Sequence, residues 1–450
     1  MKTKFLIFAC TSILFGCTAQ EYPELQNEEP QPIVNNESNI RSADEAVKIA
    51  VTGYKSFFGS LKQSRSLQEY SLNAIPVGSK RMSRTDNDTL IYVVNFPDEA
   101  GFAIVSANKE NEPILAISDQ GNYDPFDSSS NPPGMNLYIN QINESLQEGI
   151  IVGPPHPVTP PDTAKEIRTA YMDRRDTTNN ESVSAKVKAK WGQRSYYGQN
   201  CPNQTVGCGP LAIAMALSSI KVPSYINVGE PPVMPVECKW DVWSNFGWLN
   251  GYISSSYYNE YKTEIDHLSL VLRRIGIMCN AVYNNDLTTT TTFDNCKAAV
   301  NSLLKHSDYV TSDDIELREI SMPEYRYLIY NGLLFMAGRD QEERDGSQEH
   351  AWIVDGYKYC RSIFRHYEKK ETELVWRIIS ESDPHSTFYY HINWGYSGQG
   401  NGYYICPTVG GLNSLDDLVD GPTLSFGHKN KFFAIIPPNP QLYVPNFLDI

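Results

Sequence analysis

An apolar segment that begins directly after a cysteine constrains the fold more than any other feature of this chain. Between Leu211 and Ile220 most residues are apolar and favour helix, and Pro223 ends the run. A helix that is apolar on nearly every side belongs in a protein core. Pro210 suits the first turn of such a helix. The pattern therefore predicts a buried helix with Cys208 at its N-terminus.

The position of Cys208 is suitable for a nucleophile. Unpaired amides and the positive end of the helix dipole favour an anion, so they are expected to lower the pKa of the thiol. A cysteine beside a buried helix can equally be a small apolar residue that fills space. Position alone leaves both interpretations open, and partner residues have to decide between them.

A cysteine nucleophile needs a base, and the base needs a third group that orients its ring. His350 opens the strand-like segment HAWIVDGY, and His391 and Asn393 share one face of the segment YYHINW. Residues two positions apart on one strand, such as His391 and Asn393, are about 7 Å apart, which is too far for a hydrogen bond between them. Facing residues on neighbouring strands are about 5 Å apart. We therefore expect His350 as base, Asn393 as its orienter, and His391 as a structural histidine.

The order Cys208, His350, Asn393 is that of papain-like enzymes, although CGPLA differs from the local sequence around the papain cysteine. The segments WGQ…GCGPLAIAMA, EHAWIVDGY and HINWGYSGQGNGYY resemble those of the streptopain family of secreted bacterial cysteine peptidases. The resemblance implies Gln193 as oxyanion donor and Trp394 as a shield for the bond between histidine and asparagine. It also implies a papain-like cysteine peptidase domain of the α+β class.

The chemistry of acyl transfer supports these roles. The amide of Gln193 and the backbone amide of Cys208 suit the negative charge of a tetrahedral intermediate, where one donor is worth about 3 to 4 kcal/mol. The alternatives are a surface glutamine at 193 and a core aromatic residue at Trp394.

Composition excludes several classes of function. A net charge of −15 and a pI near 5.1 argue against a nucleic-acid binder. The nine cysteines form no CxxC pair and no Cys/His cluster with zinc spacing, so we expect neither a metal site nor a cofactor. Cys10 and Cys17 fall in the leader, which leaves an odd number that is compatible with a free reactive thiol.

Residues 1–17 have the pattern of an export signal. Two lysines precede an apolar run that ends at Phe15 and is too short to span a bilayer. The run leads into LFGC, which resembles a bacterial lipoprotein box and implies a membrane anchor through lipid on Cys17. Ordinary cleavage between about Gly16 and Gln20, followed by secretion, is the alternative. We expect an exported protein, either an outer-membrane or cell-surface lipoprotein or one secreted after processing.

Residues 18–39 are rich in Glu, Pro, Gln and Asn, so they are expected to form a disordered tether. Residues 40–152 form a separate small α+β unit. A helix capped by Ser42 and Glu45 is followed by the strand-like runs LIYVVNF, GFAIVSA and EPILAIS and by a second helix around residues 137–146. The run GFAIVSANKENEPILAIS resembles the prodomain of streptopain-type precursors. The resemblance implies an intramolecular inhibitor.

Residues 153–185 are interpreted as a linker and activation segment. The proline-rich stretch GPPHPVTPPD is followed by polar chain without apolar periodicity. Exposed, poorly packed chain is where proteases cut. We expect maturation between Arg174 and Lys190, and a linker that stays intact is the alternative.

The catalytic domain is expected over residues 186–440, followed by a tail at 441–450. Its first part carries helices around residues 268–275, 293–304 and 322–332, with a strand IMCNAVY after the first of them. From Leu333 onward the segments read as a sheet: LLFMAGR, HAWIVDGYKY, LVWRIIS, TFYYHINW, GYYICP and KFFAIIPP. An extra hairpin is expected between His350 and Asn393, because that interval is longer than the family's usual connection.

We therefore predict the zymogen of a secreted or lipid-anchored cysteine endopeptidase, a thiol protease that acts on protein and peptide substrates. A thiolate–imidazolium pair would form a thioester that water hydrolyses. One alternative is a papain-like acyltransferase that uses an amine as acceptor. The other is a surface binding protein on a degenerate peptidase scaffold.

Overall fold

A computed structural model provides the fold. It describes residues 39–59, 70–76, 89–149, 151, 169–228, 234–245, 253–316, 322–338, 350–370, 375–381, 385–406 and 430–440. The predicted leader, nearly all of the tether, the first part of the linker and the C-terminal tail lie outside these ranges.

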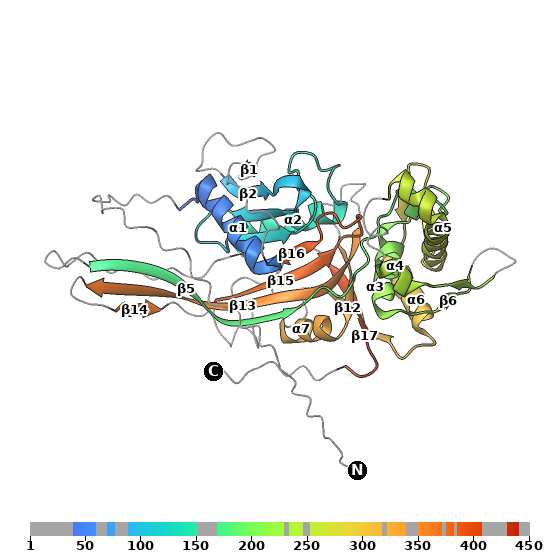
Figure 1. The fold of residues 1–450 in the computed structure, drawn as a ribbon. Coiled ribbons are helices and arrows are strands. Elements are labelled where there is room, and N and C mark those ends of the chain that lie inside the picture. Colours follow the sequence, from blue (N-terminus) through green and yellow to red (C-terminus); the bar gives the residue numbers. More distant parts are fainter. Residues whose placement is uncertain are drawn as a thin grey trace, which may run out of the picture.

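One large sheet runs through the molecule. It has thirteen strands, and ten of them form the path β1-β2-β3-β4-β16-β15-β13-β12-β17-β10. All pairings along this path are antiparallel. Figure 1 shows helices α1 and α2 on one part of this sheet, α7 beneath β13 and β12, and α3 to α6 beside the far end. The predicted α+β class is confirmed.

The strands of the path are β1 (Ser71–Pro76), β2 (Thr89–Asn95), β3 (Phe102–Ser106), β4 (Ile114–Ser118), β16 (Gly402–Ile405), β15 (His385–Asn393), β13 (His350–Lys370), β12 (Leu333–Gly338), β17 (Lys431–Ile436) and β10 (Val310–Thr311). Off the path, β5 (Thr169–Val183) and β14 (Arg377–Glu381) pair with β13, and β11 (Ile315–Glu316) pairs with β17.

The N-terminal unit has the predicted helices and meander. Helix α1 (Ala43–Phe58) begins with a capping box, in which the Ser42 side chain accepts from the Glu45 amide and the Glu45 carboxylate accepts from the Ser42 amide. Strands β2, β3 and β4 form the expected antiparallel meander, and α2 (Pro133–Gln147) follows. Strand β1 extends the sheet by one strand that the sequence pattern did not predict.

The helical part of the C-terminal unit contains α3 (Cys208–Ile220), α4 (Trp240–Asn245), α5 (Ser255–Met278), α6 (Phe293–Leu304) and α7 (Met322–Asn331). The predicted buried helix is confirmed, since every residue of α3 from Gly209 to Ser218 is buried. The expected strand IMCNAVY is largely wrong: α5 continues to Met278, and only Val282–Tyr283 pair, as β8 with β9 (Thr289–Thr290). Apolar periodicity carried the helix one turn further than the sequence interpretation allowed.

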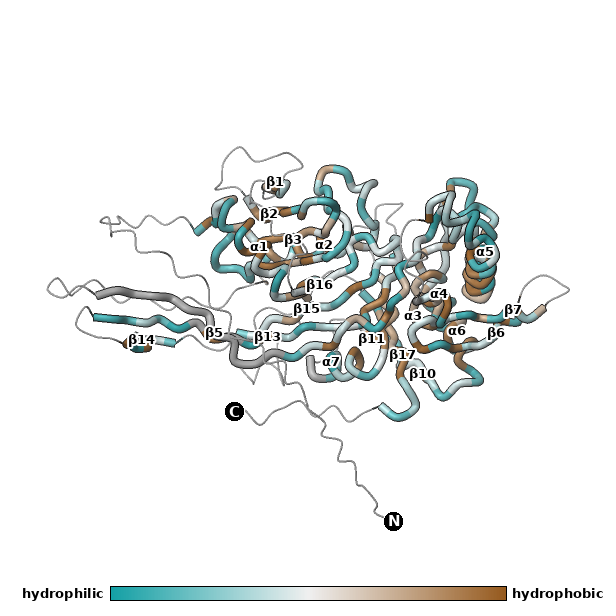
Figure 2. Tube along the Cα trace, viewed as in Figure 1, coloured by the Kyte–Doolittle hydropathy of each residue, from teal (hydrophilic) through white to brown (hydrophobic). Residues whose placement is uncertain are grey.

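The sheet separates two apolar cores. Along β13, Ala351 and Ile353 belong to the core that contains α3, α5 and α6, whereas Trp352 and Val354 belong to the core that contains the N-terminal unit. This alternation follows from the two-residue period of a strand. Figure 2 shows the outer part of β13 mostly in teal, as expected for a segment that leaves both cores.

The segment around residues 169–183 differs from its prediction as poorly packed chain. It forms β5, which pairs with β13 from Tyr357↔Val183 to Lys370↔Thr169. Figure 1 shows β5, β13 and β14 extending from the body as a long ribbon. The Glu181 carboxylate bonds the Arg326 guanidinium and the Tyr357 hydroxyl, which fixes the inner end of β5. Its polar composition misled the interpretation, because a strand outside the cores needs no apolar face.

None of the helices in the described ranges combines the length and the apolar character that a membrane-spanning segment requires.

Backbone pairing of β5 leads to a prediction for proteolysis. We expect trypsin to cut after Arg174 and Arg175 only late, because a protease must extract these residues from the ladder with β13. The measurement is limited trypsinolysis of the Cys208→Ala chain with mass spectrometry of the fragments over time. The same chain in concentrated urea is the control, in which both bonds should be cut early. Early fragments that begin at Arg175 or Asp176 in the folded chain would contradict the pairing.

Candidate active site

Cys208 is the first residue of α3, in a turn that only glycine can make. Gly207 has a φ of 93°, and a Cβ there would lie 2.9 Å from the Thr289 methyl group. A Cβ at Gly209 would lie 2.8 Å from the Cys296 sulfur. The predicted position of the cysteine at the helix N-terminus is confirmed.

The sulfur of Cys208 lies against the start of β13. The backbone amides of Ala351 and Gly209 hydrogen-bond to it. Burial nevertheless raises the pKa of the Cys208 thiol, and the neighbouring Cys296 adds to the increase. The expectation of a lowered pKa is therefore wrong for this state of the chain, because desolvation of the thiolate outweighs the amides of the helix terminus.

His350 is the first residue of β13 and precedes the residue whose amide contacts the sulfur. Burial lowers the pKa of His350 to about 4, so the ring is neutral at pH 7. By strand alternation His350 shares a face with Trp352, which packs in the core of the N-terminal unit. Among the described residues the ring has no hydrogen bond to Cys208. The structure thus places His350 next to the residue that contacts the Cys208 sulfur. The thiol and the imidazole are both neutral in this state.

Asn393 ends β15, which neighbours β13 as predicted. The expected facing pair is wrong, because Asn393 stands opposite Ile353, which is three positions after His350. The Asn393 amide donates to the Ala189 carbonyl at 2.8 Å and accepts from the Gly395 amide at 3.2 Å. The irregularity between Val354 and Gly356 contributes to a register that alternation alone could not predict. The role of Asn393 as orienter of the histidine ring stays a prediction.

His391 has a structural partner, as expected. Its Nδ1 lies 2.6 Å from Oδ1 of Asp355, which is fully buried. The other carboxylate oxygen of Asp355 accepts from the Val187 amide at 2.7 Å. Sequence reasoning missed Asp355, because only the fold shows that it anchors the chain leading to Gln193.

The anchoring continues at Lys186. Its ammonium group donates to the carbonyls of Tyr330 and Gly332 at 3.0 and 2.7 Å, at the end of α7. Burial lowers the pKa of Lys186 to about 8, and the Asp355 charge opposes that shift. Residues 186–189 are therefore an integral part of the C-terminal unit.

Gln193 and Trp394 lie where the resemblance places them in sequence, and their roles stay predictions. The Gln193 carbonyl accepts from the Val206 amide at 2.8 Å, which brings residue 193 beside the approach to the Cys208 turn. Trp394 is buried, and its ring nitrogen donates to the Gly400 carbonyl at 3.1 Å. Its ring lies 5.4 Å from that of Trp352, between centroids.

The N-terminal unit covers these strands. Strand β4 pairs with β16, with Ile117 opposite Tyr403, so the sheet continues from one unit into the other. From α2, the Tyr138 ring lies 6.0 Å from that of Trp394 and 6.2 Å from that of Trp352. A Cβ at Gly134 would lie 3.1 Å from the Trp394 ring. The unit thus packs directly on the residues that follow Ala351 and Asn393.

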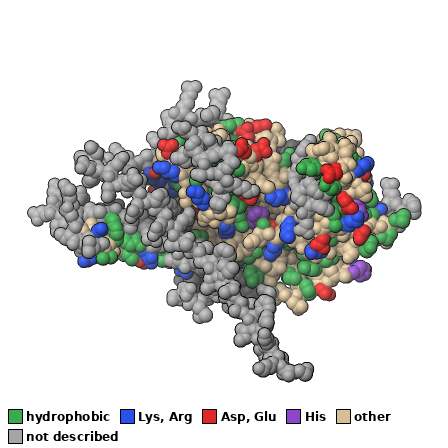
Figure 3. Space-filling view, in the orientation of Figure 1, with side chains coloured by type: hydrophobic (Ala, Val, Ile, Leu, Met, Phe, Trp, Pro, Cys, Tyr) green, Lys and Arg blue, Asp and Glu red, His purple; other side chains and the backbone are tan. Residues whose placement is uncertain are grey.

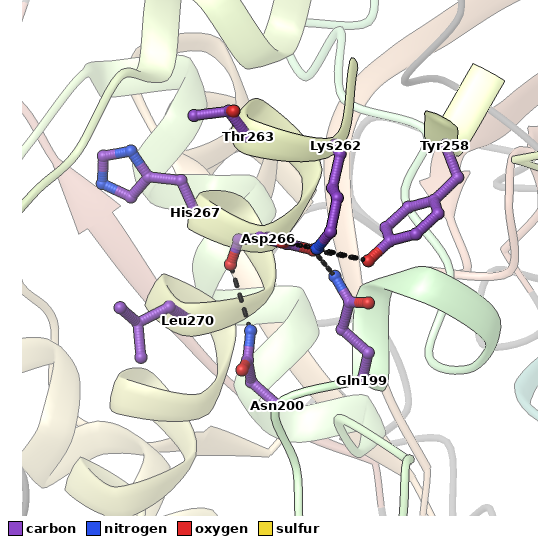
Figure 4. Close-up of a pocket in the computed structure, with 8 residues that line it drawn as sticks. All are labelled: Gln199, Asn200, Tyr258, Lys262, Thr263, Asp266, His267 and Leu270. Atoms are coloured by element: carbon purple, nitrogen blue, oxygen red, sulfur yellow. Dashed lines mark hydrogen bonds and ion pairs between the residues drawn. The ribbon is translucent and has the colours of Figure 1, made fainter. Parts of the chain in front are cut away.

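A shallow pocket of about 520 Å³ lies between residues 199–200 and α5. Figure 4 shows the side chains that line it. None of the predicted site residues lines it. Its central groups satisfy one another, since Asp266 accepts from Lys262, from the Tyr258 hydroxyl at 2.9 Å and from Gln199 at 2.6 Å. Figure 3 shows acidic and basic side chains interspersed over this helical part. We assign no chemistry to this pocket.

The part of the chain that the structure describes contains no cluster of three or more His, Cys, Asp and Glu residues placed to hold a metal.

Comparison with known proteins follows the two structural units. A family model described as the Spi protease inhibitor matches residues 38–146, and one described as the Peptidase C10 family matches residues 191–404. No curated protein matches the chain. The C-terminal unit is therefore a cysteine-type peptidase of the streptopain kind, preceded by an inhibitor-type prodomain, and the resemblance read from the sequence is confirmed.

Two solved structures from Prevotella intermedia are similar to the chain. A prointerpain A fragment is 16% identical, with a TM-score of 0.44, and the match covers 81% of this chain and 98% of that one. The active interpain A cysteine protease is 15% identical, with a TM-score of 0.32 over 56% of this chain and 94% of that one.

The pKa of His350 leads to a prediction for stability. Above its ordinary pKa near 6.5 the ring is neutral in both folded and unfolded chain. As pH falls from about 6.5 to about 4, only the unfolded chain binds the proton, so the folded state loses up to about 3 kcal/mol. Urea unfolding of Cys208→Ala at pH 7 and 4.5 measures this loss. Adding His350→Gln should remove most of it, whereas adding His306→Gln at an exposed site should not. An equal loss in both double variants would contradict the burial of His350.

Proposed function

We propose that this chain, whose residues 191–404 belong to the Peptidase C10 family, is the zymogen of an exported cysteine endopeptidase with Cys208 as nucleophile and His350 as base. One observation carries the assignment: the Ala351 amide contacts the Cys208 sulfur, so residues far apart in sequence meet at one point. The residue before Ala351 is a histidine, which is the base that a thiol nucleophile needs.

Catalysis begins when the His350 ring moves toward the sulfur and accepts its proton. The resulting thiolate attacks the carbonyl carbon of a peptide bond, and negative charge develops on the carbonyl oxygen. The Cys208 backbone amide and the Gln193 side chain donate hydrogen bonds to that oxygen. His350 then returns the proton to the leaving amine, and water hydrolyses the thioester.

Asn393 and Trp394 act through His350. Asn393 follows Ile392 on the strand beside β13, and turning its amide from Ala189 toward the imidazole would hold the ring in the productive orientation. The buried Trp394 ring limits access of water to that bond. Both residues contact the strands that the prodomain covers, so docking of the prodomain and orientation of the base are coupled.

Latency follows from the charge states. A thiolate–imidazolium pair forms only if each group gains a charge, and burial opposes both changes: Cys208 packs in the core of α3, and His350 lies on the face of β13 that the prodomain covers. Release of α2 and β4 exposes this region to water and frees the ring of His350 from the face it shares with Trp352. The prodomain thus inhibits by keeping the catalytic groups neutral and apart.

The sequence supports export and, through LFGC at Cys17, attachment to a membrane by lipid. An exported, initially covered protease is the arrangement that protects the producing cell from its own enzyme. Lipidation can be tested by replacing Cys17 with Ala and comparing partition into detergent.

The activity test compares the chain lacking residues 1–20 with its Cys208→Ala and His350→Ala variants. We expect wild type alone to process itself and to hydrolyse casein. Gln193→Ala should process slowly, with kcat lowered about 100- to 1,000-fold, because one oxyanion donor is lost. Asn200→Ala at an exposed site is the matched control and should retain activity.

Two outcomes would overturn the proposal. Casein hydrolysis by the Cys208→Ala chain would exclude this nucleophile. Failure of an electrophilic thiol reagent to label Cys208 after removal of the prodomain would favour a binding protein. Product analysis with added amine separates hydrolysis from acyl transfer.

Gly134 tests the inhibitory contact. Leu at this position would place side-chain atoms against Trp394 and Trp352, where a Cβ alone lies 3.1 and 3.4 Å from the rings. Overpacking of about 1 to 3 kcal/mol should speed alkylation of Cys208 in the uncut chain roughly tenfold or more. Gln147→Leu, at the exposed end of the same helix, is the control. Equal alkylation rates in the two variants would show that α2 does not restrain the site.

A further inference from the structure

Two buried cysteines outside the proposed mechanism lie next to each other. Cys279 follows the last turn of α5 and is fully buried, and Cys296 in α6 is 2% exposed. Both are free thiols in the structure, and they are near enough that Cys279 raises the pKa of Cys296. Helices α5 and α6 lie together beside α3 in the helical part of the molecule (Figure 1). The two thiols therefore meet at the junction of three helices.

The segment between the two cysteines packs against the turn at residues 207–209 that carries Cys208. This segment is called the wall of the turn below. The space that a Cβ at Gly209 would need is filled by the Cys296 sulfur at 2.8 Å and by the Thr291 methyl group at 3.0 Å. Thr291 also donates its hydroxyl to the Cys279 carbonyl at 2.5 Å. Thr289 donates to the Thr205 carbonyl at 2.8 Å, on the approach to Cys208. Both cysteines thus hold the wall that supports the catalytic turn.

We propose that Cys279 and Cys296 are a redox site, joined by a disulfide when the chain folds in an oxidising compartment. The oxidant is a disulfide, such as that of an oxidoreductase or of oxidised glutathione. One thiolate attacks it and releases a thiolate, and the second cysteine attacks the mixed disulfide and releases the other. Each cysteine loses a proton, and two electrons pass to the oxidant, which becomes a dithiol or two thiols.

Burial of the two cysteines determines when the disulfide can form. The hydrogen bond with Cys279 and burial raise the pKa of the Cys296 thiol, so the folded, reduced pair is a poor nucleophile. Oxidation therefore takes place while the chain folds. Once formed, the disulfide is shielded from reductants that keep the half-buried Cys208 as a thiol. The Ala351 amide holds the Cys208 sulfur at β13, although Cys296 is near enough to raise the pKa of Cys208.

The test uses the Cys208→Ala chain without residues 1–20, which prevents self-processing. The reduced, unfolded chain is refolded either with a glutathione redox buffer or with excess reductant, then alkylated and digested with trypsin. Residues 275–297 form one tryptic peptide that contains both cysteines and no other. After oxidative refolding we expect this peptide to lack alkyl groups and to be lighter by two hydrogen atoms than the unalkylated reduced form.

Stability gives a second readout. Closing the loop from 279 to 296 should raise the Tm of the oxidised chain over the reduced chain by roughly 5 to 10 °C. Cys279→Ala and Cys296→Ala should each abolish that difference, whereas Cys238→Ala, at a buried cysteine in another part of the fold, should retain it. Because mass and Tm are the readouts, the result does not depend on the proposed protease activity.

Full alkylation of peptide 275–297 after oxidative refolding would overturn the proposal. A disulfide that links this peptide to peptide 195–221, which contains Cys201, would also overturn it. If a cysteine variant fails to fold, the peptide masses of the parent chain decide alone.

Discussion

The contact between the Ala351 amide and the Cys208 sulfur joins the helical half of the peptidase unit to its sheet. Everything that the site can do depends on this meeting of a helix N-terminus with the start of β13. The helix terminus favours a thiolate, but burial disfavours it, and burial is the larger effect in the covered chain. The helix terminus still favours the thiolate in this chain, but its effect on the pKa is smaller than that of burial.

In the described residues, the prodomain contacts the region of the site through the sheet and through α2. Pairing of β4 with β16 extends one sheet across both units, and α2 packs on Trp352 and Trp394. These two residues directly follow Ala351 and Asn393. Backbone pairing therefore fixes the position of the prodomain, and aromatic packing connects α2 to the strands that carry His350 and Asn393.

Features that depend on neighbouring residues in the chain could be predicted from the sequence. The apolar helix after Cys208, the capping box at Ser42 and the meander of the prodomain all have local signals. Register and long-range pairing do not. Asn393 faces Ile353 because of an irregularity within β13, and β5 exists only because β13 extends far beyond the cores. Asp355 became visible as an anchor only when the fold brought Val187 and His391 to its two oxygens.

Strand β13 explains why docking and chemistry cannot be independent. Its alternating side chains place Ala351 on the face of α3 and Trp352 on the face of the prodomain, one residue apart. By alternation His350 shares the prodomain face, whereas the sulfur that it would deprotonate in the proposed mechanism contacts the amide of Ala351, whose side chain is on the other face. Removing the prodomain eliminates the packing that favours that face, and the strand itself need not move. In the proposed mechanism, a side-chain rotation at the end of a fixed strand would bring the ring of His350 to the sulfur and convert two neutral groups into an ion pair.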